Sequence, residues 1–147
     1  MSIASNKELV RRYIDEVWNG RQPAAPFFTP DYRRHIAATS PALTGAEQQQ
    51  RIRDFQAAFP DLQFAHEDMV AEDDRVVFRA TMRGTHQGVF RDIAPTGRHI
   101  TITVLDVVRI KGDRFAEHWG GPDLFDLLQQ LGATVSVTYP LAPAGLG

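Results

Sequence analysis

The hydrophobic pattern of this chain changes once, at Pro60, and this change constrains the fold more than any other feature. Before Pro60, apolar residues recur every three or four positions, which is the period of an amphipathic helix. After it, β-branched and aromatic residues alternate with polar ones, which is the period of a half-buried strand. Helices followed by strands predict an α+β domain, in which the sheet curls around the helical part.

The first helix is expected over residues 5–19, where six apolar side chains recur at helical spacing. Ser5 and Glu8 form a capping-box pattern at its start, and Gly20 supplies a stop signal at its end. The helix should therefore place one apolar face against something large.

The segment that follows the first helix lacks a regular pattern. Four prolines interrupt residues 21–45, so we expect several clamped turns there rather than a long element. A second core helix is predicted over residues 48–59, because Thr44 and Glu47 repeat the capping-box signal and Pro60 ends the helical spacing.

Four strands are predicted beyond the second helix, over residues 63–71, 75–84, 98–110 and 114–120. Short turns join them, which predicts an antiparallel meander. A short helix capped by Asp123 should follow, ending near Leu131. We therefore expect one domain over residues 1–133. Residues 134–147 are uncharged and contain two prolines, which predicts a frayed tail or an arm docked on a partner.

The residue inventory excludes several kinds of chemistry. The chain has no cysteine, so it has no disulfide, thiolate nucleophile or cysteine-ligated zinc. Its two lysines stand at expected surface ends, and no G-x-S-x-G or G-x-G-x-x-G motif occurs. The five histidines show no H-E-x-x-H pair or other tight ligand spacing, so a metal site could only be assembled from distant His and Asp residues. We expect no cofactor and no metal, which leaves proton transfer by Asp, Glu, His or Tyr, or binding without chemistry.

The charge pattern argues against nucleic-acid and membrane partners. The formal net charge is −2, and the only basic doublets are Arg11-Arg12 and Arg33-Arg34. Binding to phosphates needs a concentrated basic face. No apolar run approaches the roughly 18 residues of a membrane span, and the polar start has no signal-peptide core. A cytoplasmic location is the expectation.

The last predicted hairpin holds the candidate catalytic pair, Asp106 and His118. Asp106 stands in a nearly continuous β-branched strand, where a carboxylate is either paired with a residue such as Arg79 or Arg109 or is a pocket acid with a raised pKa. If the turn pairs residues whose numbers sum to an even value, Asp106 and His118 share one face. Such a pair could move a proton at neutral pH, or the carboxylate could merely satisfy a core histidine.

Four further residues are candidates for ligand binding. His35 follows a proline-rich loop that could cover a cavity mouth, and Trp119 could line an aromatic-walled cavity or simply belong to the core. Arg79 lies inside an apolar strand, so it must meet an acid or an anionic ligand. Asp123 precedes a helix, where an N-cap is the ordinary explanation.

Five motifs appear in a fixed order along the chain: F-P-D-L at 59–62, E-D-M-V-A-E-D-D-R-V at 67–76, G-T-H-Q-G at 84–88, A-P-T-G at 94–97 and E-H-W-x-x-x-D-x-x-x-L-L-Q-Q-L-G at 117–132. With them, residues 7–133 resemble the SnoaL-like polyketide cyclases of the nuclear-transport-factor-2-like superfamily. The resemblance implies a cone-shaped α+β barrel with a deep apolar pocket. It also implies a homodimer through the backs of the sheets.

The same resemblance implies cofactor-free aldol ring closure of a polyketide ester, driven by an aspartate directly after the Trp of E-H-W. This chain has Gly120 there, and it has Asp106 where the family often carries a pocket histidine. Either the acid has moved to Asp106, with His118 as its partner, or the cyclase chemistry is lost and the fold serves another ligand or reaction.

Three hypotheses follow from these residues. The first is a cyclase or isomerase in which Asp106 takes an acidic proton and His118 or a water steadies the enolate of a polyketide-like molecule. The second is a non-catalytic dimer that binds an apolar small molecule in the same cone. The third is water addition, as in related epoxide hydrolases, where an Asp-Arg-Asp set holds the water and Arg79 and Asp106 would supply two of the three groups.

Overall fold

A five-stranded mixed sheet forms the body of the computed structural model, which describes residues 2–134, 136 and 138. The strands lie in the order β1-β5-β4-β3-β2. Their bounds are β1 Phe28–His35, β2 Gln63–Glu72, β3 Arg75–Thr85, β4 His99–Lys111 and β5 Arg114–Pro122. The antiparallel meander from β2 to β5 is confirmed, and each of its strands begins within one residue of the expected position.

The strand β1 corrects the expectation of clamped turns between the two long helices. It pairs in parallel with β5 and brings Arg34 opposite His118. Pro30 favours a turn in the sequence pattern, because proline interrupts a central strand. It is tolerated on an edge strand such as β1. The pairing shifts register between Phe28 and Arg33, around the proline.

The helices are α1 Ile3–Arg12, the π-helical η1 Tyr13–Asn19, the short 3₁₀ turn η2 Ala25–Phe27, α2 Gly45–Ala58 and α3 Leu124–Gln130. The expected cap at Ser5 is wrong: Ser2 caps α1, and Ser5 is the third helical residue that completes the capping box. The caps at Thr44 and Asp123 are confirmed, because each side chain accepts a hydrogen bond from a first-turn backbone N–H.

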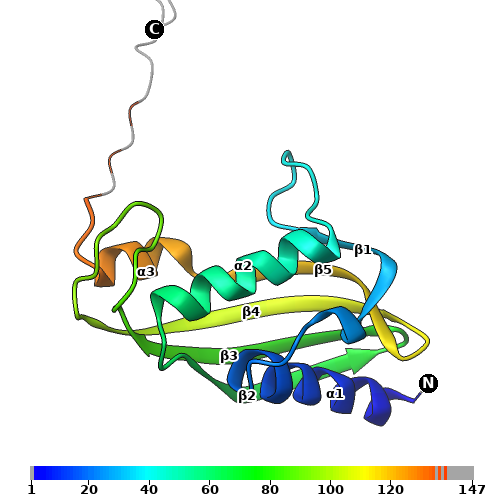
Figure 1. Cartoon of the computed structure of the whole chain (residues 1–147). Helices are drawn as coiled ribbons and strands as arrows, with labels where there is room; N and C mark the ends of the chain where they lie inside the picture. The colour runs from blue at the N-terminus through cyan, green and yellow to red at the C-terminus, as the bar shows by residue number, and fades with distance from the viewer. Residues whose placement is uncertain (1, 135, 137, 139–147) are drawn as a thin grey trace, which may run out of the picture.

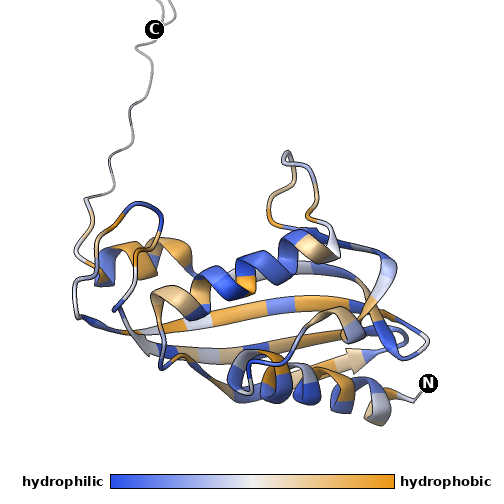
Figure 2. Ribbon diagram, viewed as in Figure 1, coloured by the Kyte–Doolittle hydropathy of each residue, from blue (hydrophilic) through white to orange (hydrophobic). Residues whose placement is uncertain are grey.

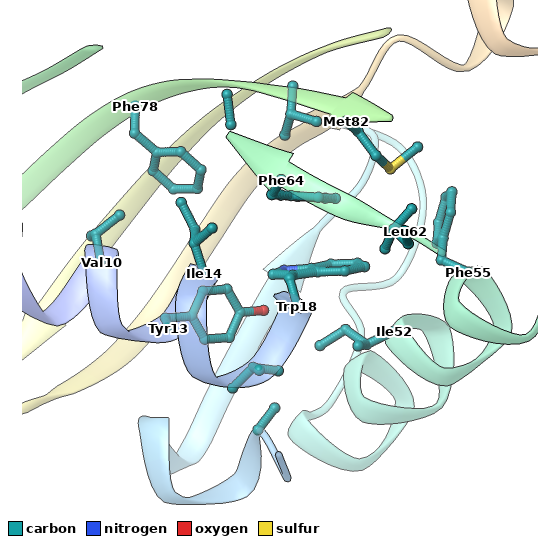
Figure 3. Packing of buried hydrophobic residues seen from close by; sticks show 14 of the residues in the cluster. Val10, Tyr13, Ile14, Trp18, Ile52, Phe55, Leu62, Phe64, Phe78 and Met82 are labelled. Atoms are coloured by element: carbon teal, nitrogen blue, oxygen red, sulfur yellow. The ribbon is translucent and has the colours of Figure 1, made fainter. Parts of the chain in front are cut away.

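The two long helices lie over one face of the curved sheet, α1 over β2 and β3 and α2 towards β1 (Figure 1). The core fills the space between them, and the outward face of α2 is hydrophilic (Figure 2). In the close view of Figure 3, Trp18 and Phe64 are stacked, with 4.5 Å between their ring centroids. Side chains alternate along β4, and its even-numbered residues, among them Asp106, face this core.

None of the helices in the described part of the chain has the length and apolarity that a membrane crossing requires. The tail or docking arm expected over residues 134–147 lies almost entirely outside the described residues.

Candidate active site

The inner face of the β4–β5 hairpin brings Asp106 and His118 together. Asp106 lies opposite Gly120 and His118 opposite Val108, so the register has the even sum that the shared face requires. Nε2 of His118 is 2.9 Å from Oδ2 of Asp106, and the two residues are 1% and 5% exposed. The expectation that they share one face is confirmed.

The strand β1 adds to this pair two residues that the sequence pattern did not single out. The hydroxyl of Tyr32 is 3.1 Å from Nδ1 of His118. The guanidinium of Arg34 donates to Oδ1 of Asp106 at 3.3 Å and to the carbonyl of Gly120 at 2.8 Å. Both side chains are almost completely buried. Their signal in the sequence is the alternation of Phe28, Tyr32 and Arg34, which share one strand face.

Burial fixes the charge state of the histidine. Burial, followed by the positive charge of Arg34, lowers the pKa of His118 to about 4, so the ring is neutral at pH 7. Burial opposes ionisation of Asp106, but His118, Arg34 and Arg51 together outweigh this effect. They hold the pKa of the carboxyl below its ordinary value. A neutral ring has one N–H. The hydrogen bonds therefore run from Tyr32 O–H to Nδ1, and from Nε2–H to the Asp106 carboxylate.

This charge state predicts a loss of stability in acid. Because the unfolded chain binds a proton on His118 near pH 6.5 and the folded chain only near pH 4, stability falls as the pH drops through that window. Fully expressed, the effect is about 3 kcal/mol. The check is the free energy of unfolding in urea between pH 7 and 4. His118→Gln should flatten this pH dependence, and an unchanged slope in that variant would contradict the assignment.

Gly120 occupies the position where the resemblance places the family acid, and the structure leaves no room there for a side chain. Its φ is +95°, a conformation that favours glycine. A Cβ at this position would collide with the carbonyl oxygen of Leu105 and lie 3.0 Å from Oδ1 of Asp106. Asp106 on β4 is the residue paired with Gly120 on β5, so its carboxylate lies beside the position that the family acid would occupy.

His35 and Trp119 lie on the other side of the sheet. Their rings stack, with centroids 5.2 Å apart, and Nε2 of His35 is 2.9 Å from Oε2 of Glu117. With Gly120, they line a surface cavity of about 460 Å³. Their role in ligand binding stays a prediction, and it concerns this outer cavity rather than the Asp106–His118 pair.

The expected pairing of Asp106 with Arg79 or Arg109 is wrong. Both arginines have odd numbers on strands whose odd positions face outwards, so neither reaches the interior. Arg79 forms an exposed ion pair with Asp68 at 2.9 Å, and Arg109 pairs with Glu117. A binding role for Arg79 would therefore have to act on the outer face.

Asp123 lies at the start of α3, where its carboxylate accepts a hydrogen bond from the N–H of Asp126 at 3.0 Å. This is the capping role that the sequence offered as the ordinary explanation. Any contact with a ligand stays a prediction.

The interior around Asp106 is filled with aromatic side chains. The ring of Tyr13 packs against those of Phe27, Phe28 and Phe115. Of five surface cavities formed by the described residues, none is lined by Asp106 or His118. A cavity of about 370 Å³ does reach Arg51, a half-buried side chain whose charge acts on both. None of these five cavities is the deep apolar pocket that the resemblance implies beside Asp106 and His118.

The family described as SnoaL-like polyketide cyclase matches residues 8–131. Among curated proteins, no sequence matches this chain. AclR from Streptomyces galilaeus, described as a candidate hydroxylase, is 28% identical over 89% of this chain and 98% of its own, with a TM-score of 0.81. TsrD from Streptomyces laurentii is 28% identical over 91% and 99%, with a TM-score of 0.79. IdmH from Streptomyces antibioticus, a candidate polyketide cyclase, is 27% identical over 87% and 99%, with a TM-score of 0.75.

Proposed function

Because the chain belongs to the SnoaL-like polyketide cyclase family, we propose that it catalyses cofactor-independent ring closure or rearrangement of a polyketide-like small molecule by acid/base chemistry. The similarity to IdmH supports a cyclase-type role. The observation that carries the proposal is the buried chain of hydrogen bonds from Tyr32 through His118 to Asp106. Such a chain has the parts of a proton relay: a hydroxyl, a neutral imidazole and an ionised carboxylate.

We assign the base to His118, acting through the hydroxyl of Tyr32. Both oxygens of Asp106 are engaged, one by His118 and one by Arg34, so the carboxylate is better placed to orient the ring than to take a proton itself. In an aldol closure, the base removes a proton from a carbon between two carbonyl groups. That carbon bonds to a distant carbonyl carbon, and the proton returns to the oxygen that becomes a hydroxyl. The reaction requires no other reagent.

The test uses a linear triketo ester whose activated methylene can attack its terminal ketone and, after loss of water, give a phenolic ring. We expect Tyr32→Phe and His118→Gln each to lower turnover at least about a hundredfold, the usual scale of general-base loss. His66→Gln, a histidine pairing with Asp15 at the surface, is the matched control and should leave turnover unchanged. Absorbance of the ring and the mass of the product are the measurements.

Two results would revise the assignment. Loss of turnover in Asp106→Asn, with Tyr32→Phe and His118→Gln both active, would make Asp106 the base. Full activity in all three variants would remove the relay from the mechanism. Product masses should be followed as well as substrate loss, because AclR, on the same fold, is described as a candidate hydroxylase.

A non-catalytic binding protein is the second candidate, and one observation favours it. Asp106 is held on both oxygens and none of the five cavities reaches it. The same assay separates the two functions, because a binding protein would bind the triketo ester tightly and release it unchanged. The water-addition hypothesis lacks such support: Asp106 is the only buried carboxylate among the described residues, and Arg79 lies outside.

A second copy of the chain is the partner that we propose for the outer face of the sheet. A transverse row of paired residues crosses all five strands there: Val70, Val77, Val107, Trp119 and His35. Val70 is 71% exposed and Leu105, beside the row, is 55% exposed. Exposed apolar side chains gathered in this way favour burial against a matching surface. Sedimentation of the whole chain in solution measures the oligomeric state.

A further inference from the structure

Helix α2 turns two polar side chains towards the interior, and the described protein satisfies neither. Gln48 and Arg51 are three residues apart, so they lie on one face of the helix, beside the buried Ile52. Gln48 is completely buried, and its Nε2 and Oε1 have no hydrogen-bond partner. Unpartnered buried amides are rare because they destabilise a fold. This position therefore indicates a bound group.

Tyr13 lies near both Gln48 and Arg34, and two further buried polar atoms there are unpartnered. The hydroxyl of Tyr13 and Nε of Arg34 are both buried without a partner. Gln48 and Arg34 are near enough to the Tyr13 hydroxyl to offset part of the rise in its pKa that burial causes, but neither forms a well-aligned hydrogen bond with it. Tyr13 is also the first residue of the π-helix η1. π-Helices are rare in proteins, and those that occur are often at functional sites. Donors from α2, η1 and β1 thus face one region.

The same region carries an excess of positive charge. The guanidinium groups of Arg34 and Arg51 both approach Gly121, where a Cβ would lie 3.2 and 3.5 Å from their nearest nitrogens. Among the described residues, Arg51 has no ion pair. Burial, with the like charge of Arg34, lowers the pKa of Arg51 to about 10, which leaves it protonated at pH 7. Asp106 balances one of the two arginines, and the neutral His118 adds no charge.

We infer that Arg51, with the free edges of Arg34, Gln48 and Tyr13, forms a subsite for a carboxylate of the substrate. A guanidinium matches a carboxylate in shape and charge, and the amide and hydroxyl can donate to its remaining lone pairs. The inference rests on the proposed function for what the bound molecule undergoes, and it deepens that function by making the substrate a carboxylic acid in its anionic form.

The approach to the subsite indicates an acid with an aromatic or unsaturated body. Arg51 lines the cavity of about 370 Å³ together with Phe55 and Phe90, and its guanidinium lies 5.1 Å from the centre of the Phe55 ring. A flat apolar body can pack against these rings while its carboxylate reaches the arginines.

Binding of benzoate to the full chain, measured by calorimetry, tests the subsite without any turnover. Benzamide has the same shape without the charge, and we expect it to bind at least tenfold more weakly. Arg51→Met should weaken benzoate binding at least tenfold. Arg53→Met, on the exposed side of the same helix, is the matched control and should leave it unchanged.

Gln48→Leu distinguishes a binding role from a purely structural one. It removes the unpartnered amide, so we expect a higher melting temperature together with at least threefold weaker benzoate binding. A lower melting temperature with unchanged binding would make Gln48 structural and overturn its place in the subsite. Asp106→Asn removes the competing negative charge, so this variant should bind benzoate at least as tightly as the original chain.

The carboxylate subsite is overturned if benzoate fails to bind, if benzamide binds equally well, or if inorganic phosphate binds more tightly than benzoate. A failure of the reaction is a separate result. If benzoate binds as expected and no triketo ester is converted, the subsite stands and the proposed ring closure falls. If both hold, the free triketo acid should bind more tightly than its ester.

Discussion

Arg34→Met is expected to lower the free energy of unfolding by about 3 to 5 kcal/mol, the usual cost of leaving one partner of a buried ion pair behind. The substitution keeps most of the apolar side-chain volume but removes the donor to Asp106 and to the carbonyl of Gly120. Asp106 then remains buried with a smaller set of charged partners, so its pKa should also rise. Urea denaturation at pH 7 measures the stability.

The same replacement elsewhere isolates the cause. Arg79→Met breaks an exposed ion pair with Asp68, and it should change stability little because such pairs contribute little. Arg34→Met combined with Asp106→Asn should cost less than the two single changes together, with a coupling of about 1 to 3 kcal/mol. Strict additivity would contradict the ion pair as the source of the loss.

Gly120→Ala is expected to destabilise the chain by at least about 3 kcal/mol, since strain and steric collision add at this position. The φ of +95° is unfavourable for alanine, and the new Cβ would strike the backbone of Leu105 on the neighbouring strand. The strand β4 would have to move, and Asp106 with it. Urea denaturation of the variant gives the stability directly.

Gly112→Ala provides the comparison, because Gly112 also has a positive φ, +65°, but nothing lies within 4 Å of its expected Cβ. Strain alone should cost about 1 kcal/mol there. If the two variants lose equal stability, backbone strain alone explains the loss, and a steric collision at Gly120 is contradicted. If they differ as expected, no larger side chain fits at position 120 unless strand β4, and Asp106 with it, moves.

Most of the fold followed from local pattern. The helical spacing before Pro60, the alternation after it, and the caps at Thr44 and Asp123 all depend on residues close together in the chain. Alternation allowed Asp106 and His118 to share one face, and the register that the structure shows for the hairpin decided that they do. The chain therefore carries in its local sequence the α+β class and the meander.

The partners of that pair depended on contacts between distant segments. Arg34 and Asp106 are 72 residues apart, and the sequence offered Arg79 and Arg109, which are nearer along the chain but face outwards. Gln48 belongs to a helix that the sequence predicted, but its burial without a partner became visible only when α2 was packed against η1 and β1.

The sequence by itself determined the α+β class, the absence of thiol chemistry, and the alternation that makes Asp106 and His118 candidates for one shared face of the last hairpin. Only the tertiary structure decided that Tyr32 and Arg34 complete the site and that position 120 is closed to a side chain. The physical reason is that periodicity reports which face a residue occupies. What lies across from that face depends on how strands pair. Here the edge strand β1, which contains a proline, pairs in parallel with β5, the last strand along the chain.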